Sequence, residues 1–98
     1  MKLTWTPRAK RDLLAIADYY SLISEDIARN VLDRIVERCI DLIDFPFQGP
    51  IHPDVPYDDI RYIIVDYYRI TYQILEEEVQ IQTVFDWRQN PASERGSE

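Results

Sequence analysis

Three arginines, Arg61, Arg69 and Arg88, lie in or beside segments whose residues alternate as in β-strands. Guanidinium groups bind carboxylates and phosphates. One interpretation is that they converge on one outward surface, because the three residues fall on neighbouring strands. The alternative is that each arginine forms an ordinary ion pair with a nearby acid, since acids outnumber bases by 18 to 11.

The strand predicted at 60–65 decides what lies beside these arginines. If Tyr62 and Ile64 face the helices, then Ile63 and Val65 face away from them together with Arg61. Aliphatic side chains on an outer sheet face favour a protein partner. We therefore predict that Ile63 and Val65 bind a partner segment.

Other reactive residues give weaker signals. His52 is the only histidine, and no serine or cysteine nucleophile lies beside it, so we expect an exposed loop residue. Cys39 falls on the apolar stripe of a predicted helix and is assigned to the core. The acidic runs 58–59 and 76–78 fit solvated turns better than a metal site. We predict no catalytic residue, no metal and no cofactor.

The elements that position these residues follow from periodicity and capping. Thr6 and Pro7 begin a first helix and Ser24 begins a second, and both helices carry one apolar stripe. A long proline-rich connection separates them from segments that alternate with a period of two. We expect an α+β fold in which a short N-terminal strand precedes an antiparallel helix hairpin packed on a three- to four-stranded antiparallel sheet, with strands at 3–5, 60–65, 68–74 and 79–87.

Length and composition limit the class of protein. The 98 residues predict a single domain over 1–91 and a frayed tail over 92–98. A formal charge of −7 disfavours direct nucleic-acid binding. The sequence contains no apolar run of membrane length, so we expect a cytoplasmic protein.

At this length, several blocks in a fixed order resemble the RelE/ParE toxin family. The resemblance extends from Leu3 to Pro91, and the combination of blocks is more specific than any one of them. The blocks are Trp5-Thr6-Pro7 with Ala9 and Leu13, Leu42 through Phe45-Pro46 and Gly49, Arg61, Tyr68-Arg69-Ile70-Thr71-Tyr72, and Val84 through Arg88.

The resemblance implies a toxin of a bacterial type II toxin–antitoxin pair, bound and neutralised by the C-terminal segment of a cognate antitoxin in a hetero-oligomer. Its ParE-like branch inhibits DNA gyrase, whereas its RelE-like branch cuts mRNA on the ribosome with lysines, arginines and usually a C-terminal tyrosine. Arg61 and Arg88 match family arginines, but no tyrosine follows Arg88 and the only lysines are Lys2 and Lys10. The ParE-like interpretation is therefore favoured over a nuclease.

From this interpretation we predict that Arg88 and Trp87 contact the target, with Arg61 and Arg69 in support. The antitoxin would cover Ile63 and Val65. The alternatives are a RelE-like ribosome-dependent endoribonuclease and an inactive module that binds only an antitoxin.

Overall fold

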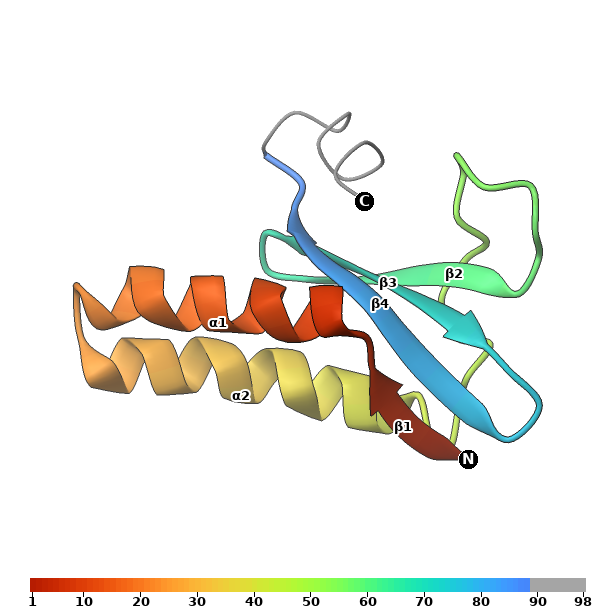
Figure 1. The fold of residues 1–98 in the computed structure, drawn as a ribbon, viewed down its shortest axis with the longest axis horizontal. Coiled ribbons are helices and arrows are strands. Elements are labelled where there is room, and N and C mark those ends of the chain that lie inside the picture. Colours follow the sequence, from red (N-terminus) through yellow and green to blue (C-terminus); the bar gives the residue numbers. More distant parts are fainter. Residues whose placement is uncertain (89–98) are drawn as a thin grey trace.

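The computed structural model describes residues 1–88, which form two helices packed on a four-stranded sheet (Figure 1). The predicted domain end at 91 and the predicted tail at 92–98 lie outside the described residues. The elements are β1 (Lys2–Trp5), α1 (Pro7–Ser21), α2 (Glu25–Asp41), β2 (Ile60–Val65), β3 (Tyr68–Ile74) and β4 (Glu78–Asp86).

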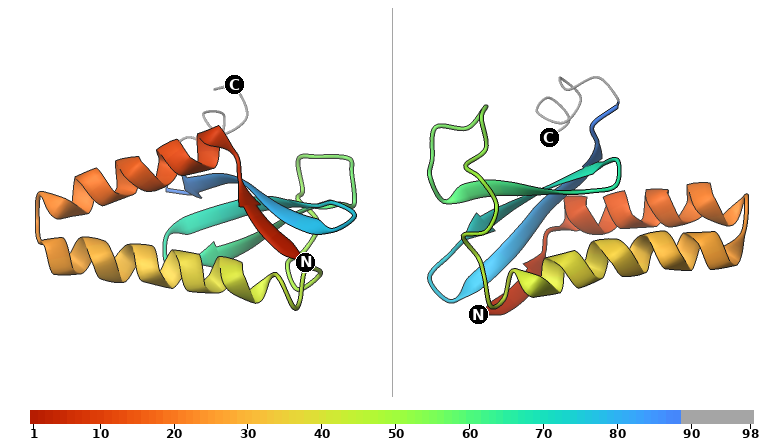
Figure 2. Two further views of the ribbon diagram at one scale, coloured as in Figure 1. Left: turned by 60° about the horizontal axis from the view of Figure 1, so that its bottom comes forward. Right: turned by 180° about the vertical axis from the view of Figure 1, so that it is seen from behind.

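Both predicted helix caps are present. The Thr6 hydroxyl accepts the Ala9 amide at 3.0 Å at the start of α1, and the Ser24 hydroxyl accepts the Ile27 amide at 3.4 Å at the start of α2. Each bond satisfies an amide that has no partner inside its helix. The two helices run antiparallel, side by side, along one face of the sheet (Figure 2).

The sheet has the strand order β1-β4-β3-β2 and is mixed rather than wholly antiparallel. β2, β3 and β4 form the predicted antiparallel meander, but β1 pairs with β4 in parallel. The whole helix hairpin and two strands separate β1 from β4 in sequence, so no tight turn fixes their relative direction. The predicted α+β class is confirmed, and the direction of β1 is the correction.

The face of β2 was predicted wrongly. Ile63 and Val65 are only 5% and 6% exposed and belong to the core, whereas Ile64 is 48% exposed on the far side of the sheet. The tight turn at Asp66 pairs Val65 with Tyr68, which places this set of residues on the helix-facing side. Because every residue of 62–65 is apolar, alternation alone could not distinguish the two faces.

His52 is also not the exposed loop residue that we expected. Its side chain is 4% exposed, and its Nδ1 accepts the Asp54 amide at 3.2 Å. The imidazole packs edge-on to Tyr62 with 5.9 Å between ring centroids. The connection between α2 and β2 thus folds back onto the face of the sheet that the helices leave open. Cys39, in contrast, is fully buried as predicted.

Candidate functional site

Arg61 lies near the start of β2, and its guanidinium bonds to backbone carbonyls of the connection that precedes this strand. Its Nη1 donates to the Gly49 carbonyl at 3.0 Å and its Nε to the Asp58 carbonyl at 3.2 Å. The guanidinium carbon also lies 5.0 Å from the ring centroid of Phe47. Arg61 therefore joins both ends of the connection that precedes β2.

Arg69 points to the opposite side of the sheet. Its guanidinium lies 5.7 Å from the ring centroid of Tyr62, and its Nη1 is 3.4 Å from Nε2 of His52. The side chain is partly covered by the long connection. Arg69 is consequently placed on a different surface from Arg61.

Arg88 follows β4 and is held in a fixed orientation. Its Nε and Nη2 donate to the two carboxylate oxygens of Asp86 at 3.0 and 2.7 Å, and its guanidinium carbon lies 4.0 Å from the Tyr67 ring centroid. The hydrogen bonds to Arg88 lower the pKa of Asp86, and the same bonds raise the pKa of Arg88. Trp87 beside it is 47% exposed.

The predicted convergence of the three arginines is therefore wrong. Each guanidinium contacts partners on a separate part of the fold, because the strand faces and the loop partners differ. Arg88, which follows the exposed Trp87 in the chain, borders an open hollow.

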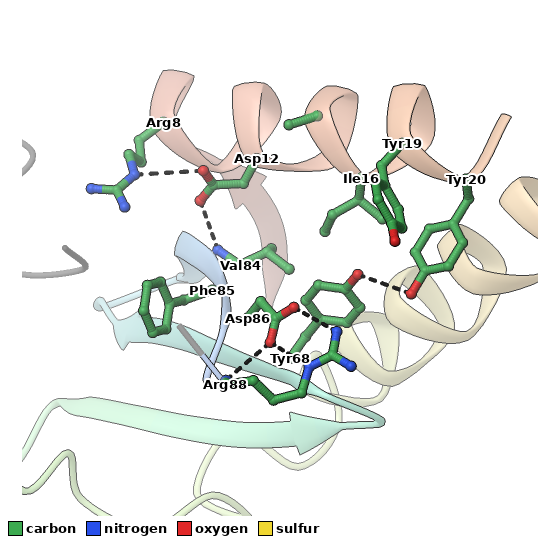
Figure 3. A pocket seen from close by; sticks show the side chains of 11 residues that line it. Arg8, Asp12, Ile16, Tyr19, Tyr20, Tyr68, Val84, Phe85, Asp86 and Arg88 are labelled. Carbon is green, nitrogen blue, oxygen red and sulfur yellow. Dashed lines mark hydrogen bonds and ion pairs between the residues drawn. The ribbon is translucent and has the colours of Figure 1, made fainter. Parts of the chain in front are cut away.

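That hollow lies between α1 and the adjacent ends of β3 and β4 and has a volume of about 450 Å³ (Figure 3). The Tyr68 hydroxyl donates to that of Tyr20 at 3.4 Å across it. We call it the α1/β4 pocket; its lining is Arg8, Asp12, Ala15, Ile16, Tyr19, Tyr20, Tyr68, Val84, Phe85, Asp86 and Arg88.

Two arginine–aspartate pairs set the electrostatics of the α1/β4 pocket. One is the pair of Asp86 and Arg88. In the other, Nε of Arg8 lies 3.6 Å from Oδ1 of Asp12, and Oδ2 of Asp12 accepts the Val84 amide at 2.9 Å (Figure 3). Burial raises the pKa of Asp12 above its ordinary value despite these partners. Positive and negative charges are therefore balanced around the hollow.

The α1/β4 pocket presents tyrosine hydroxyls beside the two arginine–aspartate pairs. Burial, together with the bond to Tyr20, raises the pKa of Tyr68, so its hydroxyl stays protonated at neutral pH. Within the described part of the chain, the lining contains no histidine, cysteine or lysine. Aromatic rings beside arginine are typical of protein-binding surfaces.

Sequence reasoning missed the contribution of α1 to this site. Tyr19 and Tyr20 end the helix as an adjacent pair, with the rings edge to face and 5.0 Å between centroids. The sequence signal was Tyr19, an aromatic residue that lies off the apolar stripe and directly precedes the stripe residue Tyr20. The structure leaves Tyr19 62% exposed. The pairing of Asp12 with the Val84 amide had no sequence signal because the two residues are far apart in the chain.

A second open region lies between α2 and the chain around the β2–β3 turn. The Arg34 Nε donates to the Asp66 carboxylate at 2.9 Å, and this salt bridge connects α2 with the β2–β3 turn. Hollows of about 540 and 550 Å³ lie on the two sides of this bridge. Val65 forms part of the wall of the first and Tyr68 of the second, so we call them together the α2/β2 groove.

Two kinds of feature are absent from residues 1–88. No helix in that range has the length and apolarity to cross a membrane. Among the same residues, no group of three or more His, Cys, Asp or Glu side chains is arranged to hold a metal ion.

Comparison with known proteins gives a family and a fold. The model of the ParE toxin of type II toxin–antitoxin systems, parDE, matches residues 3–91. The chromosomal ParDE TA system from P. aeruginosa is 30% identical with a TM-score of 0.75, covering 88% of this chain and 95% of that chain. No curated protein matches the sequence.

Two further structures share the fold alone. The YoeB/ParE toxin from Agrobacterium tumefaciens is 16% identical with a TM-score of 0.59, covering 86% of this chain and 95% of that one. The YoeB dimer from Staphylococcus aureus is 13% identical with a TM-score of 0.59, covering 86% of this chain and 93% of that one.

Proposed function

This chain belongs to the ParE toxin family of type II toxin–antitoxin systems, and on that premise we propose that it inhibits DNA gyrase by binding it. A cognate antitoxin would neutralise it in a toxin–antitoxin hetero-oligomer. The action needs a protein-binding surface and no cofactor. Because gyrase and its DNA are cytoplasmic, the proposal places the toxin in the cytoplasm.

The observation that carries the proposal is the surface at the end of β4. Arg88 is oriented by Asp86 and lines the α1/β4 pocket together with three tyrosines, and the preceding residue, Trp87, is 47% exposed. Tryptophan, tyrosine and arginine are the residues that most often dominate the energy of protein–protein interfaces. We assign target contact to Arg88 and Trp87; Arg61 and Arg69 support it by holding the connection and the sheet face in place.

A RelE-like endoribonuclease is the second candidate, and the arrangement of cations disfavours it. Cleavage of an RNA backbone without a metal needs several cations around one phosphate. Here Arg61, Arg69 and Arg88 lie on separate parts of the fold, each against a partner. A formal charge of −7 would also repel ribosomal RNA.

For the antitoxin we propose the free edge of β2. The segment at Ile51 pairs with only the first half of this edge, through the bonds from the His52 amide to the Ile60 carbonyl and from the Tyr62 amide to the Pro50 carbonyl. The second half, at Ile64, presents backbone groups to an added strand. Alternate side chains of that strand would enter the α2/β2 groove beside Val65 or cover Ile64 on the far face.

The gyrase proposal is tested by a supercoiling assay with purified protein, on a gel that separates cleaved from relaxed DNA. We expect loss of supercoiling with accumulation of cleaved DNA. Arg88→Ala should abolish the effect, whereas Arg29→Ala should retain it, because Arg29 is exposed and pairs with Asp26 on the same helix, away from the α1/β4 pocket. Unimpaired supercoiling at large molar excess of the wild type would overturn the proposal.

The remaining candidates give different outcomes in cells. A specific cut in a translated message would identify the nuclease. Tight binding to an antitoxin with unchanged growth would identify an inactive module. For the antitoxin surface, Ile64→Lys should weaken co-purification with the product of a neighbouring reading frame, and unchanged co-purification would refute the proposed edge.

A further inference from the structure

The carboxylate of Asp86 occupies the side of Arg88 that a phosphate would use. The guanidinium binds carboxylates and phosphates with the same fork, through two parallel N–H···O bonds. In Arg88 the Nε and Nη2 donors already make these bonds, at 3.0 and 2.7 Å. The Arg88 backbone amide adds a third bond to Asp86 at 3.0 Å, so the carboxylate is held from two directions.

The aromatic ring of Tyr67 also restrains the Arg88 guanidinium. The Arg88 guanidinium lies 4.0 Å from the Tyr67 ring centroid, which limits its movement away from Asp86. The carboxylate is itself largely covered, with 17% of the Asp86 side chain exposed against 49% for Arg88. A phosphate approaching Arg88 therefore finds the Nε/Nη2 fork occupied and meets a negative charge fixed beside the guanidinium.

We propose that Asp86 is a specificity-determining residue that withholds Arg88 from phosphate groups and reserves the end of β4 for a protein surface. Across the α1/β4 pocket, Asp12 likewise places a carboxylate oxygen 3.6 Å from Nε of Arg8, the second arginine of the lining. The inference rests on the proposed function, because it takes Arg88 as part of the target-facing surface. It also gives a physical reason for the end of β4 to bind protein in preference to RNA.

The test measures RNA binding and does not involve gyrase, so the two proposals can fail separately. A short fluorescein-labelled single-stranded RNA of mixed sequence is titrated with wild type, D86N and D44N at low salt, and anisotropy is recorded. Asp44 is an exposed residue outside the pocket, and D44N removes the same formal charge as D86N. We expect D86N to bind about tenfold more tightly than D44N.

A double variant, D86N with R88Q, identifies the group that gains access to the RNA. Its affinity should return to that of D44N, and the salt dependence that D86N gains, about 0.7 in the slope of log K against log salt, should disappear. Equal affinities of D86N and D44N would overturn the inference, as would a gain that persists in the double variant. Should D86N lose the native circular dichroism spectrum, D86A is measured in its place with the same expectations.

Discussion

The hydroxyl of Tyr72 provides a sharp test of how the chain between α2 and β2 is held. Tyr72 is fully buried on β3; its hydroxyl donates to the Pro46 carbonyl at 2.6 Å and accepts the Gly49 amide at 3.1 Å. This one oxygen therefore satisfies two backbone groups of the turn that follows α2. Tyr72→Phe removes the oxygen and leaves the ring and its packing in place.

The magnitude follows from the two groups that lose a partner. A buried polar group left without a hydrogen bond costs about 1–3 kcal/mol. The bond to Gly49 is buried and incurs the larger cost, whereas Pro46 lies nearer the surface and incurs the smaller. We expect Tyr72→Phe to lower the free energy of unfolding by about 2–4 kcal/mol. For a domain whose total is about 5–15 kcal/mol, this is a large fraction.

The assay is urea unfolding followed by tryptophan fluorescence. Tyr57→Phe is the matched control, because Tyr57 is 64% exposed and the same atom is removed; its effect should stay within about 0.5 kcal/mol. A loss below about 0.5 kcal/mol for Tyr72→Phe, with an unchanged slope against urea, would refute the reasoning. It would mean that water or a shifted turn satisfies Pro46 and Gly49 equally well.

Three further predictions concern individual contacts. Gly49→Ala should lower the free energy of unfolding by about 3 kcal/mol in the same urea assay, because a Cβ there would overlap the Tyr62 carbonyl oxygen; a near-neutral effect would contradict this. Arg88→Ala should raise the pKa of Asp86 toward its ordinary value of 3.8 in a carboxyl NMR titration. In the wild type the charged Asp86 carboxylate stabilises the fold above the ordinary pKa of 3.8, and this stabilisation is lost as the pH falls through the lowered pKa of the folded state. An unchanged Asp86 titration in the variant would exclude the pairing of Asp86 with Arg88 in solution. Burial raises the pKa of Cys39 to about 12, so a disulfide reagent should modify the thiol only on unfolding, and rapid modification of the native protein would be inconsistent with the core.

The sequence by itself determined the elements and the family. Thr6 with Pro7 and Ser24 fixed where the helices begin, because capping depends on residues next to one another in the chain. The position of Cys39 in the core followed equally from helical spacing. The order of the blocks from Leu3 to Pro91 indicated the family that the comparison confirms.

Only the tertiary structure decided which faces and partners these elements have. The turn at Asp66 sets the register of β2, and so buries Ile63 and Val65, where an unbroken apolar run fits either face. The environment of His52 likewise depends on a residue distant in sequence, Arg69, which the long connection brings close. Asp86 and Arg88 are neighbours in sequence, yet the pocket they border needs α1, which is why spacing along one strand could not reveal the site.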